Sequence, residues 1–324
     1  MTHFEASLII PTYNRLSSLI EALEAVAHQS FPADCFEVII VDDGSTDGTE
    51  KITERRYPFA LRYANQTNQG DASARNFGAQ IAQGEILIFI DDDIIIEPGY
   101  IEGIVKEHSG LQNTIILATI HNQIEDSFIP FQYWMGQISN SEDNLHPTFD
   151  KLCSNSMSIR RESYFHIGMM QSLGFPGSDI WCDVDFAYRA DKLGYNFRRC
   201  PSAICFHKDH NILDRTIYQE RLKIAAYRSS LLFKKYPTMI DRIPMFLDKR
   251  PISVRVDPLN LIIRKSIRSL ISCYPFMRIM EVVTEIVEEK SPKSNFLKSL
   301  YRWLMGSYIY QGYRQGLREH EGSV

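Results

Sequence analysis

Three short and almost entirely apolar runs in the first ninety positions constrain the fold more than any other feature of the sequence. Each run is four or five residues long, which is typical of a strand that is buried on both faces of a sheet. Each is followed at once by polar or acidic residues. The runs and their polar ends are Ser7–Ile10 before Pro11-Thr-Tyr-Asn, Glu37–Val41 before Asp42-Asp43, and Ile86–Ile90 before Asp91-Asp92-Asp93.

Apolar stripes at helical spacing separate these runs. Residues 16–26 carry one stripe at the i, i+3, i+4, i+7 spacing of a helix with one buried face, and Ser18 with Glu21 is expected to form a capping box at its start. Residues 74–81 carry a second stripe, and Gly84 is the expected C-terminal cap. Buried strands that alternate with amphipathic helices predict an α/β fold, in which helices flank a mainly parallel central sheet.

The composition excludes several classes of protein. Of the 324 residues, 44% are hydrophobic and 23% are charged, which is typical of a globular chain. No apolar run approaches the roughly 18 residues of a membrane-spanning helix, and Met1–Ser7 does not resemble the start of a signal peptide. The six cysteines include no Cys-x-x-Cys pair, which argues against a zinc site or a disulfide framework. We therefore expect a cytoplasmic protein.

Charge is distributed unequally along the chain. Residues 1–213 hold 15 Lys and Arg against 29 Asp and Glu, a net charge of −14, whereas residues 214–324 hold 20 against 11, a net charge of +9. The second part is expected to be mostly helical, with prolines between its helices. We predict one domain over residues 1–213 and a helical C-terminal region over residues 214–324. Because the acidic part carries the motifs, no nucleic-acid partner is expected.

The acidic strand ends predict the position of a ligand site. In an open parallel sheet, ligands bind outside the carboxyl ends of the strands. Three adjacent carboxylates at residues 91–93 would repel one another unless water or a cation neutralised them. Mg²⁺ and Mn²⁺ bind carboxylate oxygens and often share the phosphates of a nucleotide. The alternative is a solvated acidic turn before a further strand, Ile94–Ile96.

Four motifs in this order resemble glycosyltransferase family 2, and the resemblance covers about two-thirds of the chain, residues 5–210. The motifs are Ser7–Arg15, Val41–Asp47, Gly70–Gly78 and Phe89–Asp93. The resemblance implies the GT-A fold and the transfer of a sugar from a nucleotide-diphosphate sugar, usually a UDP-sugar. It also implies a divalent metal, Mn²⁺ or Mg²⁺, and inversion at the anomeric carbon. A hydroxyl of a glycan, a lipid-linked sugar or another molecule would be the acceptor.

The same resemblance implies contacts with the nucleotide. Pro11 and Tyr13 would flank the base, and Asp43 would accept a hydrogen bond from it. The alternative for Asp43 is a helix N-cap or an Asx-turn. Arg75 would lie near the base or the phosphates, with a surface position on a helix as its alternative.

The resemblance also assigns the aspartate triplet and a histidine. Asp91 and Asp92 would contact the ribose and the waters of the metal, and Asp93 would bind the metal directly. His207, at the end of a later apolar strand, would be a further metal ligand. His210 is close enough in sequence to take its place.

Two further acidic residues, Asp183 and Asp185, lie at the expected start of a helix that ends at Gly194. The family usually has Glu-Asp here, and its Asp is the general base that deprotonates the acceptor. Asp183 aligns with this Asp, but Cys182 replaces the preceding acid. Asp185 and Asp179 are therefore alternative bases. The acids could instead only stabilise the helix dipole, by about 0.3–1 kcal/mol, and the chain could be a relative that binds nucleotide-sugars without catalysis.

Two segments are left with open interpretations. Asn155–Arg161 resembles the segment that lines the acceptor side of the site in the family, although a strand followed by a helix start explains it equally well. Residues 259–287 and 296–308 alternate apolar with basic side chains. Such helices suit the surface of an anionic membrane, but a cap on the first domain or an interface with a second subunit is consistent with the same pattern.

Overall fold

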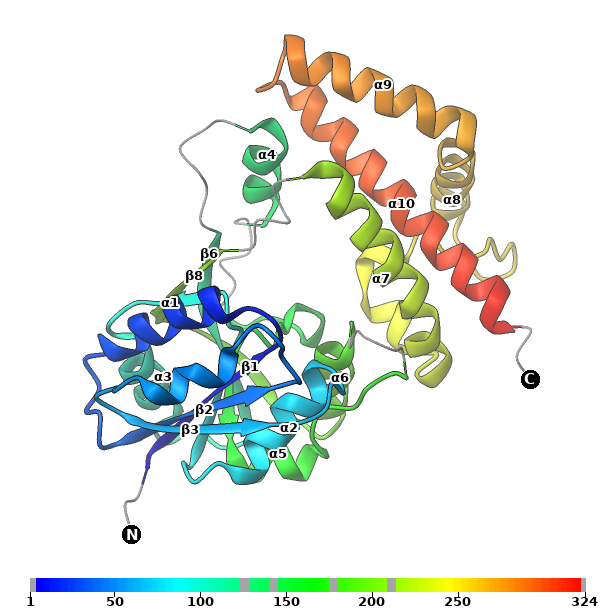
Figure 1. The fold of residues 1–324 in the computed structure, drawn as a ribbon. Helices are drawn as coiled ribbons and strands as arrows, with labels where there is room; N and C mark the ends of the chain where they lie inside the picture. Colours follow the sequence, from blue (N-terminus) through cyan, green and yellow to red (C-terminus); the bar gives the residue numbers. More distant parts are fainter. Residues whose placement is uncertain (1–3, 123–128, 140–144, 175–179, 209–213, 322–324) are drawn as a thin grey trace. The chain divides into compact units, whose positions relative to one another are not determined.

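The computed structural model describes residues 4–122, 129–139, 145–174, 180–208 and 214–321. The chain forms two compact units (Figure 1). The first contains residues 1–123 and 143–209, and the second contains residues 124–142 and 210–324. The second unit thus includes a segment that the predicted boundary at residue 213 assigns to the first domain.

In the described part of the first unit, the strands form one eight-stranded sheet in the order β3-β2-β1-β4-β7-β6-β8-β5. The first four strands in this order are mutually parallel, β7 is antiparallel to both of its neighbours, and β5 is antiparallel to β8. The α/β class is confirmed, with a sheet that is mixed. The strands are β1 (Ala6–Thr12), β2 (Phe36–Asp42), β3 (Ala60–Asn65), β4 (Ile86–Ile90), β5 (Ile94–Ile96), β6 (Thr114–Asn122), β7 (Ser156–Arg160) and β8 (Asn196–His207).

The described helices of this unit are α1 (Leu16–Ala27), α2 (Asp71–Ile81), α3 (Tyr100–His108), α5 (Arg161–Ile167) and α6 (Cys182–Lys192), with short 3-10 turns η1 (Thr49–Glu54) and η2 (Phe149–Lys151). β1, β2 and β4 are buried along their whole length, as expected of strands covered on both faces. The predicted stripe of α1 is confirmed, because its buried residues include Leu19, Leu23 and Val26.

Two local predictions are wrong. The N-cap of α1 is Arg15, and no capping box forms at Ser18. Instead, Asp47 accepts a hydrogen bond from the N–H of Leu16 at 2.9 Å, so a different loop satisfies the helix start. Gly84 is not the cap of α2, whose C-cap is Ala82. Gly84 instead permits close approach of β1, because an added Cβ would lie 2.4 Å from the carbonyl carbon of Ala6.

The described part of the second unit is helical, which confirms the helical C-terminal region. Its helices are α4 (Pro130–Ser139), α7 (Arg215–Lys235), α8 (Leu259–Ile271), α9 (Tyr274–Lys290) and α10 (Asn295–Glu321), with short turns η4 (Met239–Arg242) and η5 (Pro244–Phe246). α7 and α10 lie side by side (Figure 1). An apolar cluster of Phe131, Trp134, Leu297, Tyr301 and Met305 joins α4 to α10. Among the described residues, no helix has both the length and the hydropathy needed to cross a membrane.

Candidate active site

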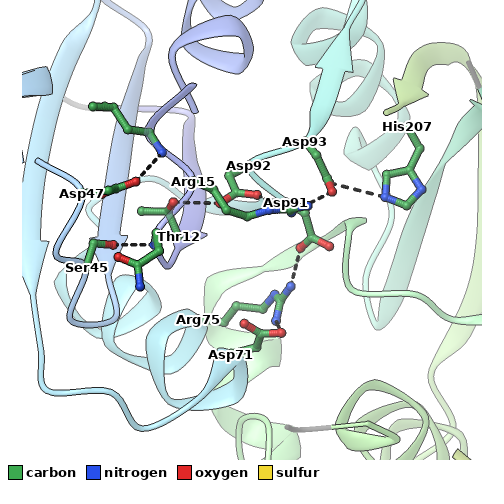
Figure 2. Close-up of polar contacts among 12 residues, drawn as sticks. Thr12, Arg15, Ser45, Asp47, Asp71, Arg75, Asp91, Asp92, Asp93 and His207 are labelled. Carbon is green, nitrogen blue, oxygen red and sulfur yellow. Dashed lines mark hydrogen bonds and ion pairs between the residues drawn. The ribbon is translucent and has the colours of Figure 1, made fainter. Parts of the chain in front are cut away.

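The loops that follow β1 and β2 are joined to each other. Asn14 has a positive φ of 53°, and its Oδ1 accepts a hydrogen bond from the N–H of Thr46 at 2.8 Å. In return, the N–H of Asn14 donates to Ser45 Oγ at 2.8 Å (Figure 2). The first and second motifs therefore form one surface at the carboxyl ends of two neighbouring parallel strands, where ligands of such sheets bind.

Asp43 closes the loop that leads into α2. One carboxylate oxygen accepts hydrogen bonds from Gln66 Nε2 at 2.7 Å and from the N–H of Gln69 at 2.8 Å, and the other accepts from the N–H of Gly70 at 2.8 Å. The hydrogen bond within the turn is made by the preceding residue, Asp42, whose Oδ1 accepts from the N–H of Ser45 at 2.8 Å. A carboxylate offers about four acceptor sites, so Asp43 retains one. Its hydrogen bond to a base stays a prediction.

We expect Asp43→Ala to lower the free energy of unfolding by about 2–4 kcal/mol, because it removes an acceptor of three hydrogen bonds to a buried carboxylate. It should also weaken UDP binding by disordering the loop 66–70. Urea unfolding measures the first effect and calorimetric titration the second. Asp34→Ala, at an exposed position in the same unit, is the control. Equal stability of the two variants would contradict this role for Asp43.

The three aspartates after β4 point in different directions (Figure 2). Asp92 is buried and accepts a hydrogen bond from Thr12 Oγ1 at 2.7 Å. Arg15 Nη1 lies 2.9 Å from Asp92 Oδ1 and 2.8 Å from Asp93 Oδ2, so one guanidinium forms ion pairs with both carboxylates. Asp91 turns away and forms an ion pair with Arg75. The repulsion expected within the triplet is therefore reduced by two arginines, Arg75 beside Asp91 and Arg15 shared by Asp92 and Asp93.

Burial and charge shift two of these carboxylates in opposite directions. Burial raises the pKa of Asp92 to about 6, although Thr12 and Arg15 both favour its ionised form. Burial alone would also raise the pKa of Asp93, but His207 and Arg15 outweigh it and lower the pKa to about 2. Asp93 is therefore the member of the triplet that most strongly keeps its negative charge.

Asp93 and His207 fit a divalent cation. His207 is the last residue of β8, and its Nε2 lies 3.4 Å from Asp93 Oδ1. Oδ1 is buried and receives no hydrogen bond from any described residue. The described residues contain no group of three or more acidic, His or Cys side chains arranged for a metal. One or two protein ligands are nevertheless typical of Mg²⁺ that shares the phosphates of a substrate. His210, the alternative ligand, lies outside the described residues.

Arg75 is buried in α2 rather than placed on a protein surface, with 3% of its area exposed. Besides Asp91, its guanidinium reaches Asp71 at 3.9 Å. This excludes the surface alternative, whereas its contact with a base or phosphates stays a prediction. Pro11 is buried within β1 beside Val41, and Tyr13, two residues later, is 48% exposed. An exposed ring at this edge is available for stacking on a base.

α6 positions the candidate bases differently. Asp185 has no exposed surface and forms an ion pair with Arg189 at 2.8 Å. Arg189 also donates to the carbonyls of Ile167 and Met169, both at 2.6 Å, so this pair fastens α6 to the end of α5. Asp185 is thus engaged in holding the fold.

Asp183 keeps partial exposure at the first turn of α6. Burial raises the pKa of Asp183, although the N–H of Val184 and the charge of Arg75 oppose the shift. A carboxylate with a raised pKa is a stronger base. Asp179 lies outside the described residues. Asn155–Arg161 forms β7 and the start of α5, as the plainer interpretation predicts, and its place beside the acceptor stays a prediction.

Thr12 and Arg15 are two site residues that the motifs alone do not identify. Both lie in the first motif, but their partners are about eighty positions further along the chain. The motif singles out this segment without indicating that its side chains reach the third strand end. Only the pairing of β1 with β4 brings them together.

The sheet and the strand-end site define a GT-A fold. The chain superimposes on the mannosyltransferase PcManGT from Pyrobaculum calidifontis in complex with GDP-Man and Mn²⁺ with a TM-score of 0.65, over 97% of this chain and 87% of that one, at 19% identity. It also superimposes on S. aureus TarS 1–349 in complex with UDP-GlcNAc with a TM-score of 0.50, over 97% and 92% of the two chains, at 18% identity. At these identities the likeness shows the fold alone.

The family follows from the sequence. The model of glycosyl transferase family 2 matches residues 7–168, and the chain belongs to this family. It is 31% identical over 227 residues to the minor teichoic acid biosynthesis protein GgaB of Bacillus subtilis, covering 68% of this chain and 23% of that protein. It is 40% identical over 108 residues to the validoxylamine A glucosyltransferase of Streptomyces hygroscopicus subsp. jinggangensis, covering 32% and 25%. The chain thus matches about a quarter of these relatives' length.

Proposed function

We propose that this chain is an inverting glycosyltransferase that moves a sugar from a nucleotide-diphosphate sugar, most simply a UDP-sugar, to a hydroxyl of a glycan or lipid-linked acceptor. One observation carries the proposal. The chain is a member of glycosyltransferase family 2, and at the strand end where the donor would bind, Asp93 Oδ1 is buried and faces His207. This oxygen accepts no hydrogen bond from any residue that the structure describes.

The proposed donor site is built from the three strand ends. Pro11 and Tyr13 would flank the base, Asp43 would shape the loop beside it, and Asp91, Asp92 and Arg75 would lie along the ribose and phosphates. Asp93 and His207 would hold Mn²⁺ or Mg²⁺. The chemistry that such an ion supplies is stabilisation of the departing diphosphate.

Asp183 is the proposed general base. Its partial exposure gives an acceptor hydroxyl access, and its raised pKa favours proton uptake. The acceptor oxygen would lose its proton to Asp183 as it attacks the anomeric carbon, and the bond from that carbon to the diphosphate would break. This single displacement inverts the configuration and needs no covalent intermediate on the protein.

Cys182 supports a competing proposal, a protein that binds nucleotide-sugars without transferring them. It stands where the family usually has an acid, and the structure buries its side chain to 4% exposure, away from solvent. The acid of the family is therefore not replaced by another polar group at this position.

A donor screen separates the two proposals. The chain is incubated with Mn²⁺ and a panel of UDP-sugars and GDP-mannose, with and without hydroxyl acceptors, and release of nucleotide is followed. A transferase should release nucleotide from at least one donor, with water as a slow acceptor. A thermal shift with UDP but no release from any donor would refute transfer and support binding alone. The anomeric configuration of the product tests inversion.

A further inference from the structure

Helix α8 buries its charged side chains. Lys265 and Arg268 are 3% and 7% exposed, and in this helix they are the residues that face inward. Lys265 Nζ lies 2.5 Å from Asp257 Oδ2 and donates to the carbonyl of Pro251 at 3.0 Å. The buried charge of Lys265 is therefore paired with a carboxylate inside the second unit, which offsets the cost of removing it from water.

Arg268 anchors the same face of α8 to α10. Its Nε lies 3.2 Å from Asp248 Oδ2, and its Nη1 donates to the carbonyl of Trp303 at 3.0 Å. The guanidinium also stacks over the Trp303 ring, 4.8 Å from the centroid. The orientation of α8 is thus fixed by polar contacts on its inner face.

The outer face of α8 is apolar. Its large side chains recur at helical spacing and are 43–73% exposed: Leu259, Ile263, Ile267 and Leu270. An amphipathic helix of a globular protein normally buries its apolar stripe. In α8 the apolar stripe is exposed to solvent, although in a globular protein it would ordinarily be packed in a core.

Helix α9 extends this surface. It buries Met277 and Thr284 and exposes a second apolar stripe, whose members are 44–79% exposed: Tyr274, Phe276, Ile279, Val282 and Ile286. Val254 and Val256, just before α8, are more than 80% exposed. We call the exposed residues of α8 and α9 together the α8–α9 face. An apolar surface of this extent on a protein normally marks an interaction site.

The charges around α8 and the start of α9 have one sign, whereas the exposed acids Glu285 and Glu289 lie further along α9. Residues 258–280 contain no Asp or Glu, and Arg255, Arg264 and Arg278 are exposed. The first acid after this stretch is Glu281, which Arg278 contacts at 3.3 Å. A two-fold dimer centred on α8 would bring its basic residues against their own copies. An anionic lipid surface instead complements both the apolar stripe and the positive charge.

We propose that the α8–α9 face inserts into the interface of an anionic lipid bilayer. The helices have 13 and 17 residues, which suits helices lying in the membrane plane rather than crossing it. The apolar side chains would enter the boundary of the acyl chains, and the arginines would remain among the lipid phosphates. This inference goes beyond the transfer reaction, and its test needs no turnover.

Flotation with vesicles tests the proposal on the full chain. The double variant Ile263→Asp, Ile267→Asp is compared with Ile217→Asp, which changes an isoleucine of similar exposure on α7. Wild type should float with vesicles of phosphatidylcholine and phosphatidylglycerol, and less at high salt. Each aspartate in the α8–α9 face should weaken binding about tenfold. The α7 variant should bind like wild type.

Three results would overturn it. Wild type could fail to float with the anionic vesicles, or the double variant could float as well as wild type. Alternatively, sedimentation without lipid could show a wild-type dimer that the double variant cannot form, with no vesicle binding, which would assign the face to a second copy. Because the substituted side chains are exposed, thermal unfolding should be unchanged, so weaker flotation cannot be attributed to misfolding.

Discussion

Asp93→Ala should abolish the Mn²⁺ dependence of UDP binding. The substitution removes the buried carboxylate that faces His207 and that keeps its charge most strongly among the three aspartates. At an effective dielectric constant of about 20, two unit charges about 4 Å apart interact by about 4 kcal/mol, so affinity for the metal should fall about 10³-fold or more. Calorimetric titration of UDP with and without Mn²⁺ measures the effect.

The control for this experiment is Asp34→Ala, which removes an equal charge from an exposed position of the same unit. The Asp93→Ala protein should remain folded, because Arg15 keeps its second partner, Asp92, at 2.9 Å. An unchanged response to Mn²⁺ in Asp93→Ala would refute the proposed metal site. His207→Ala should show a smaller loss, since a neutral ligand is removed and the carboxylate remains.

The strand ends could be predicted from the sequence because they depend on local patterns. An uninterrupted apolar run such as Ile86–Ile90 has few alternatives to a buried strand, and the structure has β4 at these residues. The same holds for the stripe of α1. The mixed part of the sheet could not be predicted. β7 inserts antiparallel between β4 and β6, and this placement depends on contacts with segments about seventy and about forty positions earlier in the chain.

The partners of the site side chains depend on tertiary structure. The expected capping box of α1 failed because Asp47, from another loop, supplies the acceptor. Arg15 lies close to Asp92 and Asp93 only because β1 and β4 are neighbours in the sheet. The spacing of motifs identifies which segments form the site, whereas ion pairs within it are set by strand order.

Periodicity also leaves one question open for every amphipathic helix. It divides α8 into an apolar and a charged face but does not tell which face is buried. Asp248 and Asp257 decide this, because they offer carboxylates to Arg268 and Lys265 on the inner side. Both acids precede α8 in regions without helical periodicity, so the outward orientation of its apolar face could be found only in the structure.

Asp183→Asn should leave affinity for the donor nearly unchanged and slow transfer by about 10²–10⁴-fold, the usual contribution of a general base. The amide keeps the size of the side chain but takes up no proton. Steady-state rates with the donor found by screening, together with calorimetric binding of UDP, measure both effects. Full activity of Asp183→Asn would place the base elsewhere.

The pH profile gives a second, independent reading. A base must be ionised to accept a proton, so kcat/KM of the wild type should fall as pH drops through the pKa of Asp183. Since burial raises this pKa above its ordinary value of 3.8, the fall should begin above that pH and should be absent from the residual activity of Asp183→Asn.

Asp185→Asn provides the contrast. It removes the fully buried carboxylate that pairs with Arg189 and should cost about 3–5 kcal/mol of stability, while the acidic limb remains. If the limb instead disappeared in Asp185→Asn and persisted in Asp183→Asn, the two aspartates would have to exchange roles, because only the general base must lose its proton before the acceptor can react.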